Sequence, residues 1–324
     1  MRGSSWLVRG VVIGCLAGVP CGVRGQGTSD RKRYSPPRTA GGQPNISGMW
    51  EPGPGRPLEK ARGGPWRPPA GSTAGTGSAF TFFAPGDELP GGRATDRSPM
   101  VFEPADGIIP LQPWAVARRD EIIASQDKVE FLDPRVRCLQ AGVPRANLPV
   151  FYNSYQILQT PGRVVILYEW NHMTRIIPLD GRPHLPSAVR LANGDSRGHW
   201  EGNSLVIDVT NFSPKTDVQG SRENLHLVER WTRTGPNSLE YSVTMEDPTV
   251  WTRSWTVKQE FTKESEQQNR IYYEPRCNEG NCGLPGLMHG LRAQELDFAE
   301  GKGPHPATKD IATDFVGVED DPLQ

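Results

Sequence analysis

The chain has 324 residues, and its 36 Lys and Arg nearly balance its 37 Asp and Glu, for a formal net charge of −1. This balance excludes the strongly basic surface that binding to nucleic acid or to an anionic membrane requires. Its 31 Pro and 36 Gly gather toward the N-terminal third. That distribution indicates one folded domain behind a long lead-in rather than two domains of average size.

Residues 1–25 predict a secretory signal peptide. A leader with Arg2 and Arg9 precedes an uncharged run and then small residues, so we expect cleavage after Gly25. The mature protein would be periplasmic or extracellular. An alternative is a lipoprotein processed at Cys15, although Arg9 leaves only a very short apolar segment before that cysteine. No later stretch approaches ~18 consecutive apolar residues, so we expect no transmembrane segment in the mature chain.

Residues 26–110 are rich in Pro, Gly and Arg and show little periodicity. This composition predicts an extended and partly disordered lead-in. Short apolar islands, at Ile46, at Met49–Trp50 and at Phe80–Phe83, offer places where the lead-in attaches to a folded body.

The segment Leu111–Phe131 predicts a helix. Pro113 stands where a first-turn proline is tolerated, and Ile122 and Ile123 contribute to an apolar face. Asp133 and the proline after it end the pattern. Such a helix most often covers a sheet.

From Ser154 onward, strand patterns alternate with turn residues. About eight strands at hairpin spacing predict a mainly β fold, either a barrel or a sandwich, and the count favours an antiparallel lipocalin-like or calyx-like barrel over residues 111–295. We also expect one or two covering helices, including a short one at Leu284–Glu300, and a flexible tail over residues 296–324. The expected strands are Ser154–Gln159, Arg163–Ile177, His199–Glu201, Ser204–Val209, Asn224–Arg233, Leu239–Glu246, Val250–Phe261 and Arg270–Glu274.

The longest expected strand, Arg163–Ile177, carries most of the candidate binding residues. Its alternation places Glu169, Asn171 and Arg175 on one face. If that face lines a barrel interior, Glu169 is a candidate buried acid or base, and Arg175 can hold a carboxylate in a bidentate contact. The ordinary alternative is a solvated face with a weak Glu–Arg pair.

Two His–Glu pairs are candidates for proton transfer, His199 with Glu201 and His172 with Glu169, because histidine titrates near neutrality and a carboxylate can orient it. His226 lies on a third expected strand, so three imidazoles and a carboxylate are available for a metal. No HExxH motif or short ligand spacing accompanies them, and no GxSxG motif surrounds a serine. We therefore predict no metal and no cofactor.

These residues indicate a pocket for a small molecule inside the barrel. Indole rings suit an apolar ligand or a sugar ring. Two alternatives remain open. One is a hydrolase or lyase that acts on a small metabolite or sugar derivative by His/Glu acid–base catalysis, and the other is a structural or interaction protein of the envelope. The expected pocket residues are Glu169, Trp170, Asn171, Arg175 and Trp200.

Four sequence motifs occur in order along the chain: CLQAGVPRANLPVFYNSYQILQTPGRVVILYEWNHMTRIIPLDGRP, GDSRGHWEGNSLVIDVTNF, LHLVERWTR and CNEGNCGLPG. Together they resemble a family of uncharacterised exported bacterial proteins. The resemblance covers residues 40–50 and 108–295. It carries no established activity and no catalytic residues over to this chain.

Removal of the leader would leave three cysteines, Cys138, Cys277 and Cys282. In an oxidising compartment, one disulfide and one spare thiol is the simplest arrangement, and the count alone leaves the pairing open. The family resemblance implies that Cys138 pairs with Cys277, because relatives commonly have an aromatic residue where this chain has Cys282. A loop of that length would contribute about 4–5 kcal/mol in the chain-entropy model.

Overall fold

The computed structural model describes residues 34–53, 58–59, 99–124, 142–148, 154–264 and 283–305. All of them belong to one compact unit that spans Tyr34–Gln324. The expected signal peptide and the three later cysteines lie outside the described residues, so export and the Cys138–Cys277 disulfide stay predictions.

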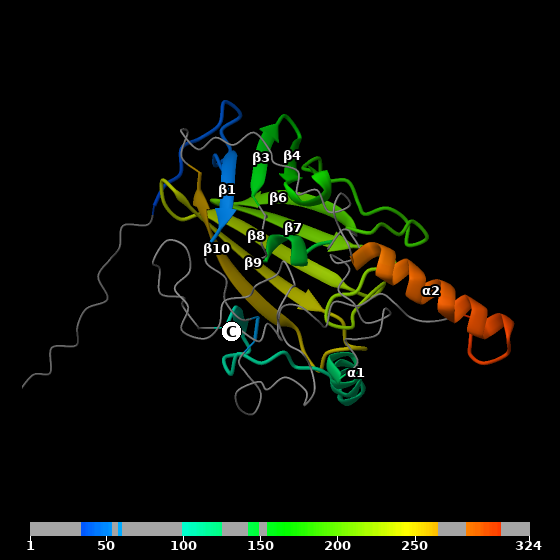
Figure 1. Ribbon diagram of the computed structural model, residues 1–324. Coiled ribbons are helices and arrows are strands. Elements are labelled where there is room, and N and C mark those ends of the chain that lie inside the picture. The colour runs from blue at the N-terminus through cyan, green and yellow to red at the C-terminus, as the bar shows by residue number, and fades with distance from the viewer. Residues whose placement is uncertain are drawn as a thin grey trace, which may run out of the picture. The chain divides into compact units, whose positions relative to one another are not determined.

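Ten strands form a single sheet (Figure 1). The strand order is β5-β4-β3-β1-β10-β9-β8-β7-β6, with β2 paired to β10 off this path. Every pairing is antiparallel. The strands are β1 (Gly48–Pro52), β2 (Val101–Glu103), β3 (Tyr155–Thr160), β4 (Arg163–Tyr168), β5 (Thr174–Pro178), β6 (Asp195–Glu201), β7 (Ser204–Thr210), β8 (His226–Arg233), β9 (Ser238–Glu246) and β10 (Trp255–Lys263).

The sheet curls until its two end strands, β5 and β6, meet through side chains. The Arg175 guanidinium on β5 donates hydrogen bonds to Ser196 Oγ on β6. Gly198 allows the two strands to approach closely, because a Cβ at this position would lie 2.7 Å from side-chain atoms of both Ile177 and Leu179. The result is a nearly closed antiparallel barrel of nine strands, which confirms the expected fold class.

Alternation along each strand sorts the side chains between the interior and the outer surface. On β9, four alternate residues from Leu239 to Met245 are buried, and their neighbours are at least partly exposed. The interior is not purely aliphatic. It also contains fully buried rings from six different strands, namely Trp50, Tyr155, Tyr168, Trp231, Tyr241 and Phe261.

The expected single strand Arg163–Ile177 is wrong, because the chain reverses in its middle. β4 ends at Tyr168, a 3-10 turn η3 (Trp170–His172) follows, and β5 returns alongside β4. Asn171 and His172 take positive φ angles of 54° and 46°, and asparagine is among the residues that tolerate this conformation. The alternation assumed across this stretch therefore does not hold.

The lead-in supplies part of the barrel. β1 lies between β3 and β10, and both Ile46 and Trp50 are fully buried. These two residues belong to the apolar islands expected to attach the lead-in to the body. The other edge of β10 pairs with β9, and the expected partner of this region, Arg270–Glu274, lies outside the described residues.

Two helices accompany the sheet. α1 (Pro113–Ala124) falls within the expected helix, and α2 (Gly283–Ala299) matches the short helix expected near the C-terminus. The indole N–H of Trp114 on α1 donates to Thr249 O at 2.9 Å, and Arg119 pairs with Glu59 at 2.8 Å. Neither helix is long and apolar enough to cross a membrane. Besides η3, the described residues include the 3-10 turn η2 (Arg145–Asn147).

Candidate functional site

A cluster of polar side chains is buried in the barrel interior. At its centre, Arg175 Nη2 donates to Glu229 Oε2 at 2.5 Å. Arg175 is 4% exposed and Glu229 is 0% exposed. A buried ion pair is costly to form and is tolerated when further hydrogen bonds satisfy its remaining atoms.

Further partners surround both charges. Glu229 Oε1 accepts hydrogen bonds from Asn147 Nδ2 at 3.0 Å and from the Tyr241 hydroxyl at 2.7 Å. Ser196 Oγ accepts from Nε and Nη2 of Arg175 at 3.0 and 2.9 Å. The cluster thus joins β5, β6, β8, β9 and η2. We call Arg175, Glu229, Asn147, Tyr241 and Ser196 the interior cluster.

Strand alternation explains why these polar groups face inward. Glu229 shares its side of β8 with Leu227 and Trp231, both fully buried. Asn147 does not come from a strand but from the 3-10 turn η2. The carbonyl of Ala146 in this turn accepts a hydrogen bond from the Tyr155 hydroxyl. The interior cluster is therefore assembled from residues far apart in the chain.

The interior environment shifts several pKa values. Burial raises the pKa of the Tyr168 hydroxyl to about 12, although nearby Arg175 partly opposes the shift. Burial together with the Glu229 carboxylate raises the pKa of Tyr241 well above its ordinary value. For Arg175, burial acts to lower the pKa, but Glu229 together with Tyr168 and Tyr241 outweighs it and the pKa is raised. Both tyrosines are thus neutral hydroxyl groups, and the guanidinium keeps its charge.

Several interior polar atoms have no hydrogen-bond partner within the described parts of the chain. Two belong to the interior cluster itself, Arg175 Nη1 and Asn147 Oδ1. Trp231 Nε1 and Gln259 Oε1 also have no hydrogen-bond partner there. Both residues are cross-strand neighbours of Tyr241. An unsatisfied buried polar group costs about 1–3 kcal/mol. The Tyr168 hydroxyl lies beside Arg175 and Asn147 and interacts with both.

The residues expected from the sequence to form one site lie in three places. Glu169, Trp170, Asn171 and His172 lie at the turn between β4 and β5, where Glu169 Oε2 accepts a hydrogen bond from Ser154 N at 3.1 Å. Arg175 alone of this group joins the interior cluster.

His199 and Glu201 lie on the outer face of β6, at 58% and 47% side-chain exposure. His199 Nε2 contacts Glu201 Oε1 at 2.9 Å, and Arg230 contacts Glu201 Oε2 at 2.8 Å. These two partners lower the pKa of Glu201, His199 more than Arg230. Trp200, on the other side of the same strand, packs against the core.

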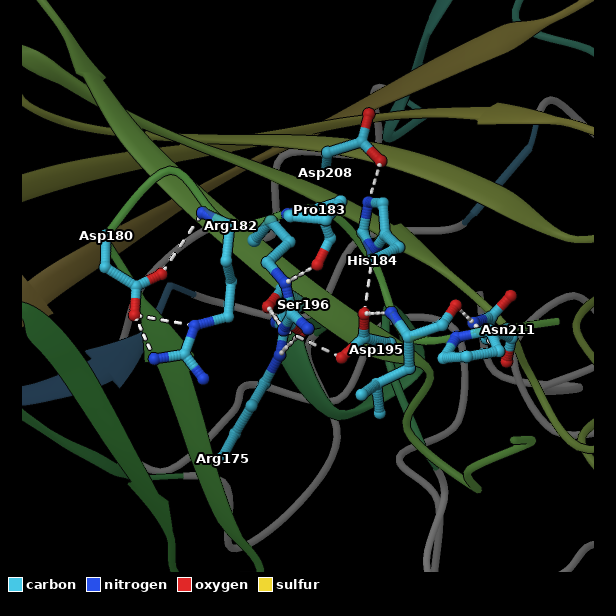
Figure 2. Close-up of polar contacts among 12 residues, drawn as sticks. Arg175, Asp180, Arg182, Pro183, His184, Asp195, Ser196, Asp208 and Asn211 are labelled. Atoms are coloured by element: carbon cyan, nitrogen blue, oxygen red, sulfur yellow. Dashed lines mark hydrogen bonds and ion pairs between the residues drawn. The ribbon is translucent and has the colours of Figure 1, made fainter. Parts of the chain in front are cut away.

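A second polar network, not expected from the sequence, lies where the loop between β5 and β6 folds onto the barrel. Figure 2 shows His184 between Asp195 of β6 and Asp208 of β7, at 2.8 Å from each. Asp208 also contacts His226 Nε2 at 3.0 Å. Leu185 N donates to Asp195 Oδ2 at 3.0 Å, and Asn211 Nδ2 donates to Leu185 O at 2.7 Å. We call this group the loop network.

No group of three or more His, Cys, Asp or Glu residues within the described ranges has a geometry that could hold a metal ion. The loop network consists of hydrogen bonds between imidazole, carboxylate and backbone groups. It holds one loop against two strands.

No protein-family model and no curated protein matches this sequence. Among solved structures, a secretory abundant heat soluble protein from Ramazzottius varieornatus is similar at 11% identity and a TM-score of 0.24, over 38% of this chain and 82% of that one. Lipid binding protein 8 from Caenorhabditis elegans is similar at 7% identity and a TM-score of 0.23, over 41% and 88%. EF1p2_mFAP2b, in a structure bound to DFHBI, is similar at 14% identity and a TM-score of 0.20, over 35% and 79%. Similarity at this level carries no implication for function.

Proposed function

We propose that this protein binds a small molecule inside its barrel, with the interior cluster as the anchor for the polar part of the ligand. The observation that carries the proposal is the interior cluster itself, a buried group of charged, amide and hydroxyl side chains inside a barrel that is otherwise filled by apolar and aromatic side chains.

The lining of the interior supports an apolar body for this ligand. The Tyr155 and Tyr168 ring centroids are 5.0 Å apart, and those of Trp231 and Tyr241 are 4.5 Å apart. Small-molecule sites are mostly apolar and aromatic, with a few polar groups that fix orientation. This combination is what the interior offers.

A hydrolase or lyase that uses His199 and Glu201 has less support, because both side chains are about half exposed and already contact each other. Export to the periplasm or cell exterior remains part of the proposal and rests on the N-terminal sequence. In that compartment the protein would act as a binding protein for a compound met outside the cytoplasm.

Binding can be tested with N-phenyl-1-naphthylamine, a neutral apolar dye whose fluorescence rises in an apolar site. We expect saturable binding of one dye per chain, with quenching of tryptophan emission. We also expect native mass spectrometry to detect a retained dye mass. An absence of both signals would refute the proposal.

Paired variants locate the site. Replacing both charges of the interior pair, Arg175→Met with Glu229→Gln, avoids leaving one charge buried alone. We expect it to weaken dye binding at least ~10-fold, or about 1.4 kcal/mol. The matched control, Arg230→Met with Glu201→Gln, removes an exposed pair from the outer face of the barrel. Equal binding by both double variants would place the dye elsewhere.

A further inference from the structure

The loop network joins imidazoles to carboxylates, so its hydrogen bonds depend on where the protons are. We infer that the network is a pH-dependent latch, which holds the loop between β5 and β6 against β7 while the His184 ring is protonated and loosens when that proton is lost. The inference goes beyond the proposed function, because it does not depend on a ligand in the barrel.

Both ring nitrogens of His184 face carboxylates. Nδ1 lies 2.8 Å from Asp195 Oδ2, and Nε2 lies 2.8 Å from Asp208 Oδ1 (Figure 2). An ionised carboxylate can only accept a hydrogen bond, so each contact needs a proton on the nitrogen. Neutral imidazole has one N–H, whereas imidazolium has two. Only the protonated ring therefore makes both hydrogen bonds, and a neutral ring would turn a lone pair toward one of the carboxylates.

His226 on β8 extends the arrangement. Its Nε2 lies 3.0 Å from Asp208 Oδ2, and its Nδ1 lies 3.6 Å from Glu246 Oε2 on β9. Asp208 thus contacts two imidazoles, one through each oxygen. The line of alternating carboxylates and imidazoles crosses the outer surface from the loop to β9.

Charges from the neighbouring strands face both imidazoles. β6 contributes Asp195 and Arg197, whose Nη1 lies 2.8 Å from Asp195 Oδ1. β7 contributes Asp208 and β9 contributes Glu246. Three carboxylates therefore face one guanidinium, and the charges balance when both imidazoles are protonated.

Within the loop, the other charged side chains have partners of their own. Arg182 Nε donates to Asp180 Oδ2 at 2.7 Å, and Arg190 Nη1 donates to Glu223 O at 2.7 Å. The two imidazoles are thus the groups of this network that ordinarily titrate near neutral pH.

Burial indicates which contact a neutral His184 would lose. The Asp195 side chain is 5% exposed, whereas that of Asp208 is 41% exposed. Water can replace the imidazole at Asp208 more easily, so the single N–H of the neutral ring would stay with Asp195. Leu185 N also donates to Asp195, and Leu185 O accepts from Asn211. Loss of the proton therefore loosens the loop without detaching it.

The direction of the pH effect follows from proton counting. The latched loop holds a proton that the loosened loop does not need, and the state that binds more protons is favoured as the pH falls. The loop is therefore held more tightly in mild acid than in mild base.

Hydrogen exchange of the full chain, measured by mass spectrometry and corrected for the intrinsic pH dependence of exchange, tests this inference. The measurements are made at about pH 5.5 and about pH 8, on either side of the range in which histidine ordinarily titrates. We expect protection of residues 179–194 to be about 3- to 5-fold lower at the higher pH, the size of effect that a partly exposed ion pair produces. The paired strands β9 and β10 should keep their protection. Equal loop protection at both pH values would overturn the inference.

Two variants assign the effect to the latch. His184→Gln replaces the ring by an amide that does not titrate, so we expect low loop protection at both pH values. Asp208→Asn lets a neutral imidazole find a donor, so the pH difference should shrink. Either variant decides the matter if the other does not fold, because a full pH difference in it would overturn the assignment. The control His199→Gln removes an exposed imidazole from the outer face of β6 and should keep the full difference.

Discussion

Glu229 accepts hydrogen bonds from three other residues of the interior cluster. One of its oxygens takes the Arg175 guanidinium, and the other takes Asn147 and Tyr241. A carboxylate with this many donors can remain charged in an apolar interior, whereas removal of one partner would leave an uncompensated charge. This is why the variants that probe the pair change both residues together.

The first prediction concerns Tyr168 and Tyr241, among the seven tyrosines of the chain. Burial raises the pKa of Tyr168 to about 12 and that of Tyr241 well above its usual range. The ordinary value in an unfolded chain is about 10. Because the folded pKa is higher, the stability that Tyr168 contributes is complete below about pH 10 and is lost as the pH rises toward about 12.

The measurement is the ultraviolet absorbance of tyrosinate as the pH is raised on folded protein. We expect a late phase that includes both residues, separate from the phase of ordinary tyrosines. Tyr168→Phe should reduce the late phase by one tyrosine. A late phase of unchanged amplitude in this variant would contradict the prediction.

The ion-pair partner of Arg175 is an example of a contact that sequence spacing alone does not predict. Glu229 was not among the residues expected at the site, although it shares the buried side of β8 with Leu227 and Trp231. Spacing suggests Glu169 as the partner of Arg175, six residues away. The actual partner is 54 residues away, because closure of the barrel brings β5 toward β8, and no local pattern encodes that closure.

Among the elements, the loop between β5 and β6 is held against the barrel by polar side chains, with His184 in contact with two strands. His184 contacts Asp195 and Asp208, and Arg197 Nε donates to Pro183 O at 3.0 Å. Figure 2 shows these contacts beside the Arg175–Ser196 link that joins the end strands of the sheet. The loop is therefore held next to the Arg175–Ser196 contact between β5 and β6 that closes the barrel.

We predict that His184→Gln loosens this loop. An amide cannot reach both aspartates as the imidazole does, so the loss should be on the order of 1 kcal/mol. Hydrogen exchange measured by mass spectrometry should be faster in residues 179–194 and unchanged in the β8–β9 hairpin. His199→Gln is the control, since His199 lies on the outer face of β6, where it contacts Glu201. Unchanged exchange in the loop would show that the remaining contacts hold it.

Elements bounded by strong turn residues were predictable. The β6–β7 hairpin turns at Gly202, with a φ of 60°, and the β8–β9 hairpin forms as expected. The β4–β5 turn was missed because it contains no glycine or proline, and its positive φ angles fall on Asn171 and His172. The loop network was missed because no local pattern brings His184 between two aspartates on neighbouring strands.

For the molecule as a whole, the barrel depends on a strand from the N-terminal lead-in. Nine strands form the wall, and β1 joins β3 to β10. The sequence predicts the strand-rich C-terminal region but not this insertion, since Gly48–Pro52 is short and begins and ends with residues that disfavour strands. The position of β1 is determined by its pairing with the edges of β3 and β10 and by the burial of Trp50.

The last prediction follows from that arrangement. A chain beginning at Pro54 lacks β1, so β3 and β10 each expose an unpaired edge, and the space filled by Ile46 and Trp50 is empty. Loss of a buried tryptophan alone costs about 3–5 kcal/mol, and open edges favour aggregation. We expect this chain to lose near-ultraviolet circular dichroism and cooperative thermal unfolding.

A chain beginning at Tyr34 retains every described residue and should keep both. A synthetic peptide of residues 34–53 should restore the signal by strand addition, and the same peptide with Trp50→Ala should restore much less. Cooperative unfolding of the chain that begins at Pro54, without added peptide, would show that the barrel closes without its N-terminal strand.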